Sequence, residues 1–95
     1  MAITGRGLSL EEFLALPEEE PALEYADGEV TQKVSPNAWH GKLQFVIAGR
    51  LDRPGVSSAF TETRTTYAGR SFVPDVIAFA WERAPVEANG EIPPD

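Results

Sequence analysis

A carboxylate stands near the head of the most apolar stretch of the chain. The run "SFVPDVIAFA" spans residues 71–80, and in it Pro74 directly precedes Asp75. Moving an unpaired charge out of water is costly, so such a carboxylate is expected to be paired or bound to a metal ion. Two interpretations stay open: an ion pair with Arg64 or Arg70, or a ligand for a hard divalent cation, which prefers oxygen donors.

Three further side chains could take part in acid–base or metal chemistry. His40 is the single histidine of the chain, and a lone histidine is more often a surface or core residue than a ligand. Glu24 lies on the first strand of an expected hairpin, where an exposed or salt-bridged carboxylate is the ordinary finding. Glu62, in "TETRT", lies one strand before Asp75 and is a weaker candidate for a metal site.

The composition limits the class of protein. Ninety-five residues are enough for one small domain, and 42% hydrophobic with 24% charged residues is ordinary for a soluble globular protein. The absence of cysteine excludes a disulfide framework and a thiolate metal site. No apolar run approaches the ~20 residues of a membrane span, and the N-terminus has no signal-peptide pattern. We therefore expect a cytoplasmic protein with no membrane partner.

The charge is unevenly distributed along the chain. The net charge of −7 argues at first sight against a nucleic-acid partner, because phosphates attract Lys and Arg. Residues 1–32 hold one basic and eight acidic side chains, whereas residues 33–70 hold six basic and two acidic ones. A basic middle segment is compatible with a surface that faces phosphates, and equally with ordinary solvated faces.

Two local motifs predict the first elements. In "SLEEFLALP", Ser9 and Glu12 have the spacing of a capping box, which predicts a short helix that Pro17 ends. In "ALEYADGEVTQKVS", Asp27 and Gly28 predict a tight turn between two strands.

The segment from Ser35 to Gly55 is predicted to be the main helix. Ser35 is the expected cap, Pro36 suits the first helical position, and Pro54 marks the end. Its apolar residues recur at helical spacing and are expected to pack against a sheet. They are Trp39, Leu43, Val46 and Ile47. Packing is also the expected role of Trp81.

The remaining sequence predicts strands and then a loop. "SSAFTETRTTY" alternates like a strand, residues 68–70 form a turn, and 71–80 is the expected central strand. These elements predict an α+β domain: short helix, hairpin, long helix, then antiparallel strands. A fully apolar strand normally has neighbours on both sides, yet only loop follows it here, so the domain is expected to be truncated. An uncovered apolar edge favours pairing with a second copy, as a dimer or higher homo-oligomer.

The order of these motifs resembles that of a known bacterial family. Residues 9–95 resemble the Uma-two family of restriction-endonuclease-like proteins, which have the PD-(D/E)XK nuclease fold. The matching positions are Glu24, Asp27, Gly28, Glu29, Ser35, Pro36, His40, Pro74 and Asp75. Two positions depart from the family pattern: Leu23 stands where Tyr is usual, and Val73 stands where Arg is usual.

The resemblance implies a metal-dependent DNA endonuclease that hydrolyses phosphodiester bonds. It makes Asp75 a catalytic residue and a ligand of Mg²⁺, gives His40 a catalytic or phosphate-contacting role, and puts Glu24 at the edge of the active site. In the family, a second acidic ligand and a lysine follow the loop that here reaches Asp95. The chain over 1–95 is therefore expected to be the N-terminal part of the domain, with an incomplete active site and no activity alone. The alternative is a catalytically inactive nuclease-like module that acts in binding or dimerisation.

Overall fold

The chain forms two compact units. The computed structural model describes residues 2–87 and 90–94. The first unit, called the sheet unit below, comprises the described parts of Met1–Ser35, Thr65–Val73 and Pro94–Asp95. The second, called the α2 unit, comprises those of Pro36–Arg64 and Pro74–Pro93. The mixture of antiparallel sheets with one main helix confirms the predicted α+β class.

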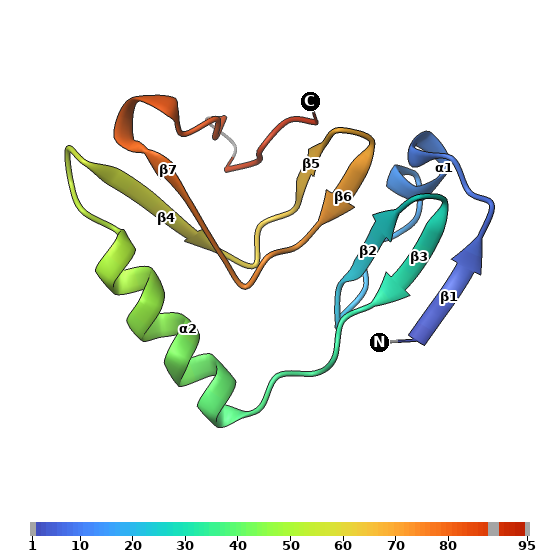
Figure 1. Ribbon diagram of the computed structural model, residues 1–95, viewed down its shortest axis with the longest axis horizontal. Coiled ribbons are helices and arrows are strands. Elements are labelled where there is room, and N and C mark those ends of the chain that lie inside the picture. Colours follow the sequence, from blue (N-terminus) through green and yellow to red (C-terminus); the bar gives the residue numbers. More distant parts are fainter. Residues whose placement is uncertain (1, 88–89, 95) are drawn as a thin grey trace. The chain divides into compact units, whose positions relative to one another are not determined.

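The sheet unit is built on five antiparallel strands in the order β1-β3-β2-β6-β5 (Figure 1). The strands are β1 (Ala2–Arg6), β2 (Leu23–Ala26), β3 (Glu29–Gln32), β5 (Thr65–Tyr67) and β6 (Arg70–Phe72). The N-terminal strand β1 was not predicted, because its five residues include Gly5, are followed by Gly7 and show little apolar alternation. It forms by pairing with β3, a contact that no local pattern reveals.

Both tight turns of this sheet use left-handed backbone. Asp27 and Gly28 have φ of 52° and 80°, the two positive angles that a two-residue hairpin requires, which confirms the predicted β2–β3 hairpin. Ala68 and Gly69 repeat the geometry, with φ of 52° and 75°, between β5 and β6.

The buried core lies in the sheet unit, under the short helix α1 (Leu10–Leu14). Ser9 and Glu12 form the predicted capping box, and the helix ends at Leu14, before Pro17. Phe13 is buried, and its ring stacks on Tyr25 with centroids 5.3 Å apart. The core cluster consists of Phe13, Leu23, Tyr25 and Val30.

The α2 unit holds the main helix and a two-stranded antiparallel sheet. Helix α2 (Ala38–Leu51) contacts both β4 (Ser57–Thr61) and β7 (Val76–Ala80), and the 3-10 turn η1 (Trp81–Arg83) follows β7 (Figure 1). Strands β4 and β7 pair along their whole length, from Ser57↔Ala80 to Thr61↔Val76. No helix within the described residues is long and apolar enough to cross a membrane.

The prediction of one central strand over residues 71–80 is wrong. Strand β6 ends at Phe72 and β7 begins at Val76, and the two belong to different sheets. Pro74 accounts for the break, because it cannot donate to a strand ladder. The run is thus the junction of two strands, and Asp75 lies in that junction rather than inside a ladder.

The predicted helix boundaries and burial also need correction. Asn37, rather than Ser35, caps α2, and its side-chain Oδ1 accepts a hydrogen bond from the His40 N–H at 3.0 Å. The apolar stripe that was expected to pack is exposed instead: Trp39 is 77% exposed and Leu43 60%. Val46 and Ile47 are also exposed, and no described residue of α2 is buried. A sheet of only two strands offers too little area to cover a helix of 14 residues.

Candidate metal centre

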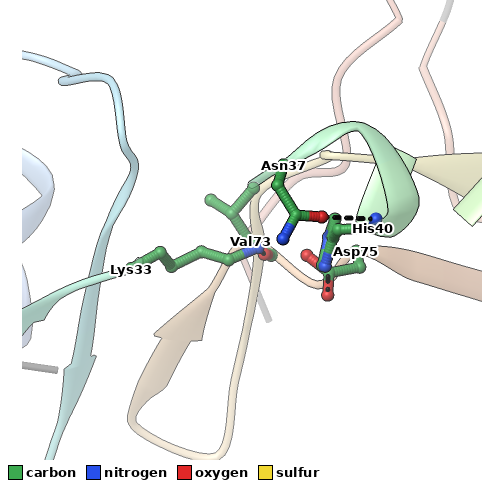
Figure 2. A network of polar contacts seen from close by, with 5 residues as sticks. All are labelled: Lys33, Asn37, His40, Val73 and Asp75. Carbon is green, nitrogen blue, oxygen red and sulfur yellow. Dashed lines mark hydrogen bonds and ion pairs between the residues drawn. The ribbon is translucent and has the colours of Figure 1, made fainter. Parts of the chain in front are cut away.

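The first turn of α2 and the junction before β7 bring His40 and Asp75 together. His40 Nε2 lies 3.3 Å from Asp75 Oδ2 (Figure 2). The side chains are 38% and 43% exposed, so solvent and small ligands can reach both. The Asn37 cap contacts the backbone of His40 and thereby fixes the start of the helix that carries the imidazole.

Glu62 completes a group of three potential ligands. One ligand atom each of His40, Glu62 and Asp75 lie within 4.8 Å of one another, and we call these residues the His-Glu-Asp cluster. Strand register explains why the two carboxylates meet. Thr61 pairs with Val76, so Glu62 and Asp75 are the next residues on two antiparallel neighbours.

The donor set fits a divalent metal ion. It offers one imidazole nitrogen and two carboxylate oxygens, whose two negative charges balance a divalent cation. Two ligand atoms that bind one ion at about 2.1 Å in adjacent positions lie roughly 3.0–3.4 Å apart. The 3.3 Å between His40 Nε2 and Asp75 Oδ2 already has this value. Glu62 is an exposed residue, so its carboxylate has room to adjust.

Glu24, the third candidate catalytic residue, lies in the sheet unit. Its Oε2 accepts a hydrogen bond from the backbone N–H of Val73 at 2.9 Å. The Nζ of Lys33 donates a hydrogen bond to the carbonyl oxygen of Val73 at 2.5 Å (Figure 2). We call this arrangement the Val73 clamp. Val73 is buried, so its backbone groups need partners inside the protein.

Two further residues near the candidate site in the sequence have contacts in the sheet unit. Of the arginines proposed as ion-pair partners of Asp75, Arg70 lies against Asp27, with Nη2 and Oδ1 3.6 Å apart. Sequence reasoning missed Lys33, because nothing in the sequence links it to Val73, 40 residues later. Glu62 was the weaker candidate from the sequence, and the strand register that puts it opposite Asp75 follows from pairing the two apolar segments.

The comparisons with known proteins point to nucleases. A family model described as "Putative restriction endonuclease", Uma2, matches residues 10–95. A solved structure described as a putative nuclease belonging to DUF820, from Anabaena variabilis ATCC 29413, is similar with a TM-score of 0.78 and 41% sequence identity.

That match covers 90% of this chain and 50% of the Anabaena protein, so the chain spans about half the length of its solved relative. No curated protein matches the chain. The extent of the family match, over nearly all of the sequence, shows that the chain belongs to the Uma2 family of restriction-endonuclease-like proteins.

Proposed function

We propose that the chain is the metal-binding part of a DNA endonuclease that hydrolyses phosphodiester bonds with a divalent ion. The observation that carries the proposal is the His-Glu-Asp cluster, a donor set for a divalent cation in a chain that belongs to a nuclease family. DNA is the proposed partner, and the cytoplasm, where DNA is accessible, is the proposed location.

Each candidate residue has a proposed role. Asp75 is a ligand of the ion, for which the family resemblance implies Mg²⁺. A bound divalent ion stabilises negative charge on a phosphate and lowers the pKa of bound water. The Nε2 of His40 faces the same position and can contact the ion or a phosphate oxygen. For Glu24, the family resemblance supports a place at the edge of the active site, and within the sheet unit its carboxylate accepts a hydrogen bond from the backbone N–H of Val73.

The activity of the chain alone is a separate part of the proposal. The family resemblance implies a further acidic ligand and a lysine in a segment after the loop that reaches Asp95. We therefore propose that the 95 residues bind the ion but do not cleave DNA. Sequencing the gene beyond codon 95 tests this: a Glu-bearing strand and a Lys-bearing helix would support it, and a stop codon would favour the inactive module.

The decisive experiment is a cleavage assay on the complete gene product with supercoiled DNA. We expect cleavage to require a divalent ion and to be abolished in Asp75→Asn, with little change in melting temperature because the His40–Asp75 pair is substantially exposed. Glu82→Gln, which removes an exposed carboxylate outside the cluster, is the matched control. Loss of stability with cleavage retained would identify Asp75 as a structural residue and refute the proposal.

A second candidate function is a nuclease-like module that acts by self-association. It is favoured by the exposed apolar side chains of the α2 unit, which include Trp39, Leu43, Phe45, Val46, Ile47, Leu51, Val56 and Trp81. Among the described residues, β4 and β7 pair only with each other. Each of them therefore has an unpaired edge to which a strand of a second copy could add. Light scattering tests this: a concentration-dependent dimer would support it, and a monomer at high concentration would refute it.

A further inference from the structure

We propose that the His-Glu-Asp cluster is a three-ligand site for a first-row transition metal ion such as Zn²⁺, with His40 Nε2 as a direct ligand. The role of the ion in hydrolysis rests on the proposed function, whereas its identity rests on the donors of the cluster. This assignment differs from the magnesium site that the family resemblance implies.

The types of donor favour a transition metal. Mg²⁺ binds oxygen atoms in a near-ideal octahedron and keeps several of its waters, so it is held by one or two carboxylates. Imidazole nitrogen suits Zn²⁺ and the ions of copper, iron and nickel, whereas carboxylate and water oxygens suit Mg²⁺ and Mn²⁺. In this cluster the imidazole is as close to Asp75 as two ligands of one ion would be, at 3.3 Å.

The secondary structure supports a direct role for both carboxylates. Glu62 directly follows β4 and Asp75 directly precedes β7, and these two strands pair with each other. One strand register therefore places both carboxylates side by side. His40 approaches from a third element, the first turn of α2. Three elements that converge within 4.8 Å supply three ligands, and the partial exposure of His40 and Asp75 leaves positions for water or substrate. Three protein ligands with an open position are typical of catalytic rather than structural sites.

The single histidine makes the test unambiguous. The nitrogen-15 signals of the imidazole are measured by NMR on the untagged 95-residue chain, during titration with Zn²⁺ and, separately, Mg²⁺. We expect Zn²⁺ to shift the Nε2 signal and Mg²⁺ to leave it unchanged. Calorimetric titration is expected to give an affinity for Zn²⁺ at least about tenfold above that for Mg²⁺.

Variants assign the individual ligands. His40→Asn, Glu62→Gln and Asp75→Asn should each weaken binding of Zn²⁺ at least about tenfold, since each removes one of three ligands. Glu82→Gln, outside the cluster, should leave the affinity unchanged. Circular dichroism of each variant verifies that the fold is retained. If Glu62→Gln binds like the original chain, the three-ligand assignment is wrong.

The outcomes separate this inference from the proposed function. Equal affinity for Mg²⁺ and Zn²⁺, with an unshifted imidazole, would overturn the inference, while metal-dependent cleavage that Asp75→Asn abolishes would still support the nuclease. Zinc binding through the three residues in a gene product that cleaves no DNA would uphold the inference and refute the nuclease. Failure of every ion to bind at millimolar concentration would overturn the site itself.

Discussion

At the scale of single residues, Val73 shows how side chains replace a strand partner. Its N–H donates to Glu24 and its carbonyl accepts from Lys33, so both polar backbone groups are satisfied where β6 has just ended. Glu24 matches the family motif as a catalytic candidate, and its carboxylate contacts the backbone of Val73. A charged residue can therefore match a family motif and also stabilise the fold of the sheet unit.

The Val73 clamp predicts a clear loss of stability in Lys33→Met. The methionine keeps most of the length of the side chain but leaves a buried carbonyl without its donor, which costs about 1–3 kcal/mol in the free energy of unfolding. Urea denaturation measures it. Lys42→Met is the matched control, because the ammonium group of Lys42 lies over the exposed Trp39 ring and its loss should cost less than about 0.5 kcal/mol. Equal effects of the two variants would show that the clamp contributes nothing.

At the scale of elements, the locally encoded features were predictable. The Ser9–Glu12 capping box and the Asp27-Gly28 turn depend on residues at most three apart, and both form as expected. The division of residues 71–80 between two sheets was not predictable, because the periodicity of an apolar run does not show which sheet each of its ends joins. The meeting of His40, Glu62 and Asp75 likewise depends on strand register and helix position.

The capping box predicts a pH dependence of α1. The Ser9 backbone N–H, and after it the Ser9 hydroxyl, hold the pKa of Glu12 below its ordinary value. A lowered pKa in the folded state means that the charged form stabilises the helix. This contribution is complete above the ordinary pKa of glutamate and is lost as the pH falls through the lowered value.

The amide proton shift of Ser9, followed by NMR through acidic pH, measures this titration. We expect its midpoint below that of an ordinary glutamate, and Glu12→Gln should abolish it. Glu11→Gln, which removes the neighbouring exposed carboxylate, should leave it intact. A Ser9 titration that persists unchanged in Glu12→Gln would contradict the assignment.

At the scale of the whole molecule, stability is concentrated in one unit. Every described residue that is fully buried lies in the sheet unit, whereas the α2 unit carries the candidate metal centre and has no buried residue among those described. The sequence could not reveal this asymmetry, because the apolar stripe of α2 looks the same whether or not a partner covers it.

The same substitution in the two units measures the asymmetry. Leu23→Ala removes a core side chain that is 6% exposed and should cost about 2–5 kcal/mol in the free energy of unfolding. Leu43→Ala, on a residue that is 60% exposed, should cost less than about 0.5 kcal/mol at low protein concentration. A large effect at position 43 that grows with concentration would instead reveal a partner that covers α2.

The backbone at Glu62 has a consequence for how this chain can change over evolution. Its φ of 50° is a left-handed conformation that costs a residue other than glycine about 1–2 kcal/mol. Glycine would relieve that cost but would bring no carboxylate to the cluster. If the cluster binds metal, selection for stability and selection for the ligand act in opposite directions at this position. Relatives that have lost the chemistry should then drift toward glycine or asparagine here, while relatives that retain it keep the acid.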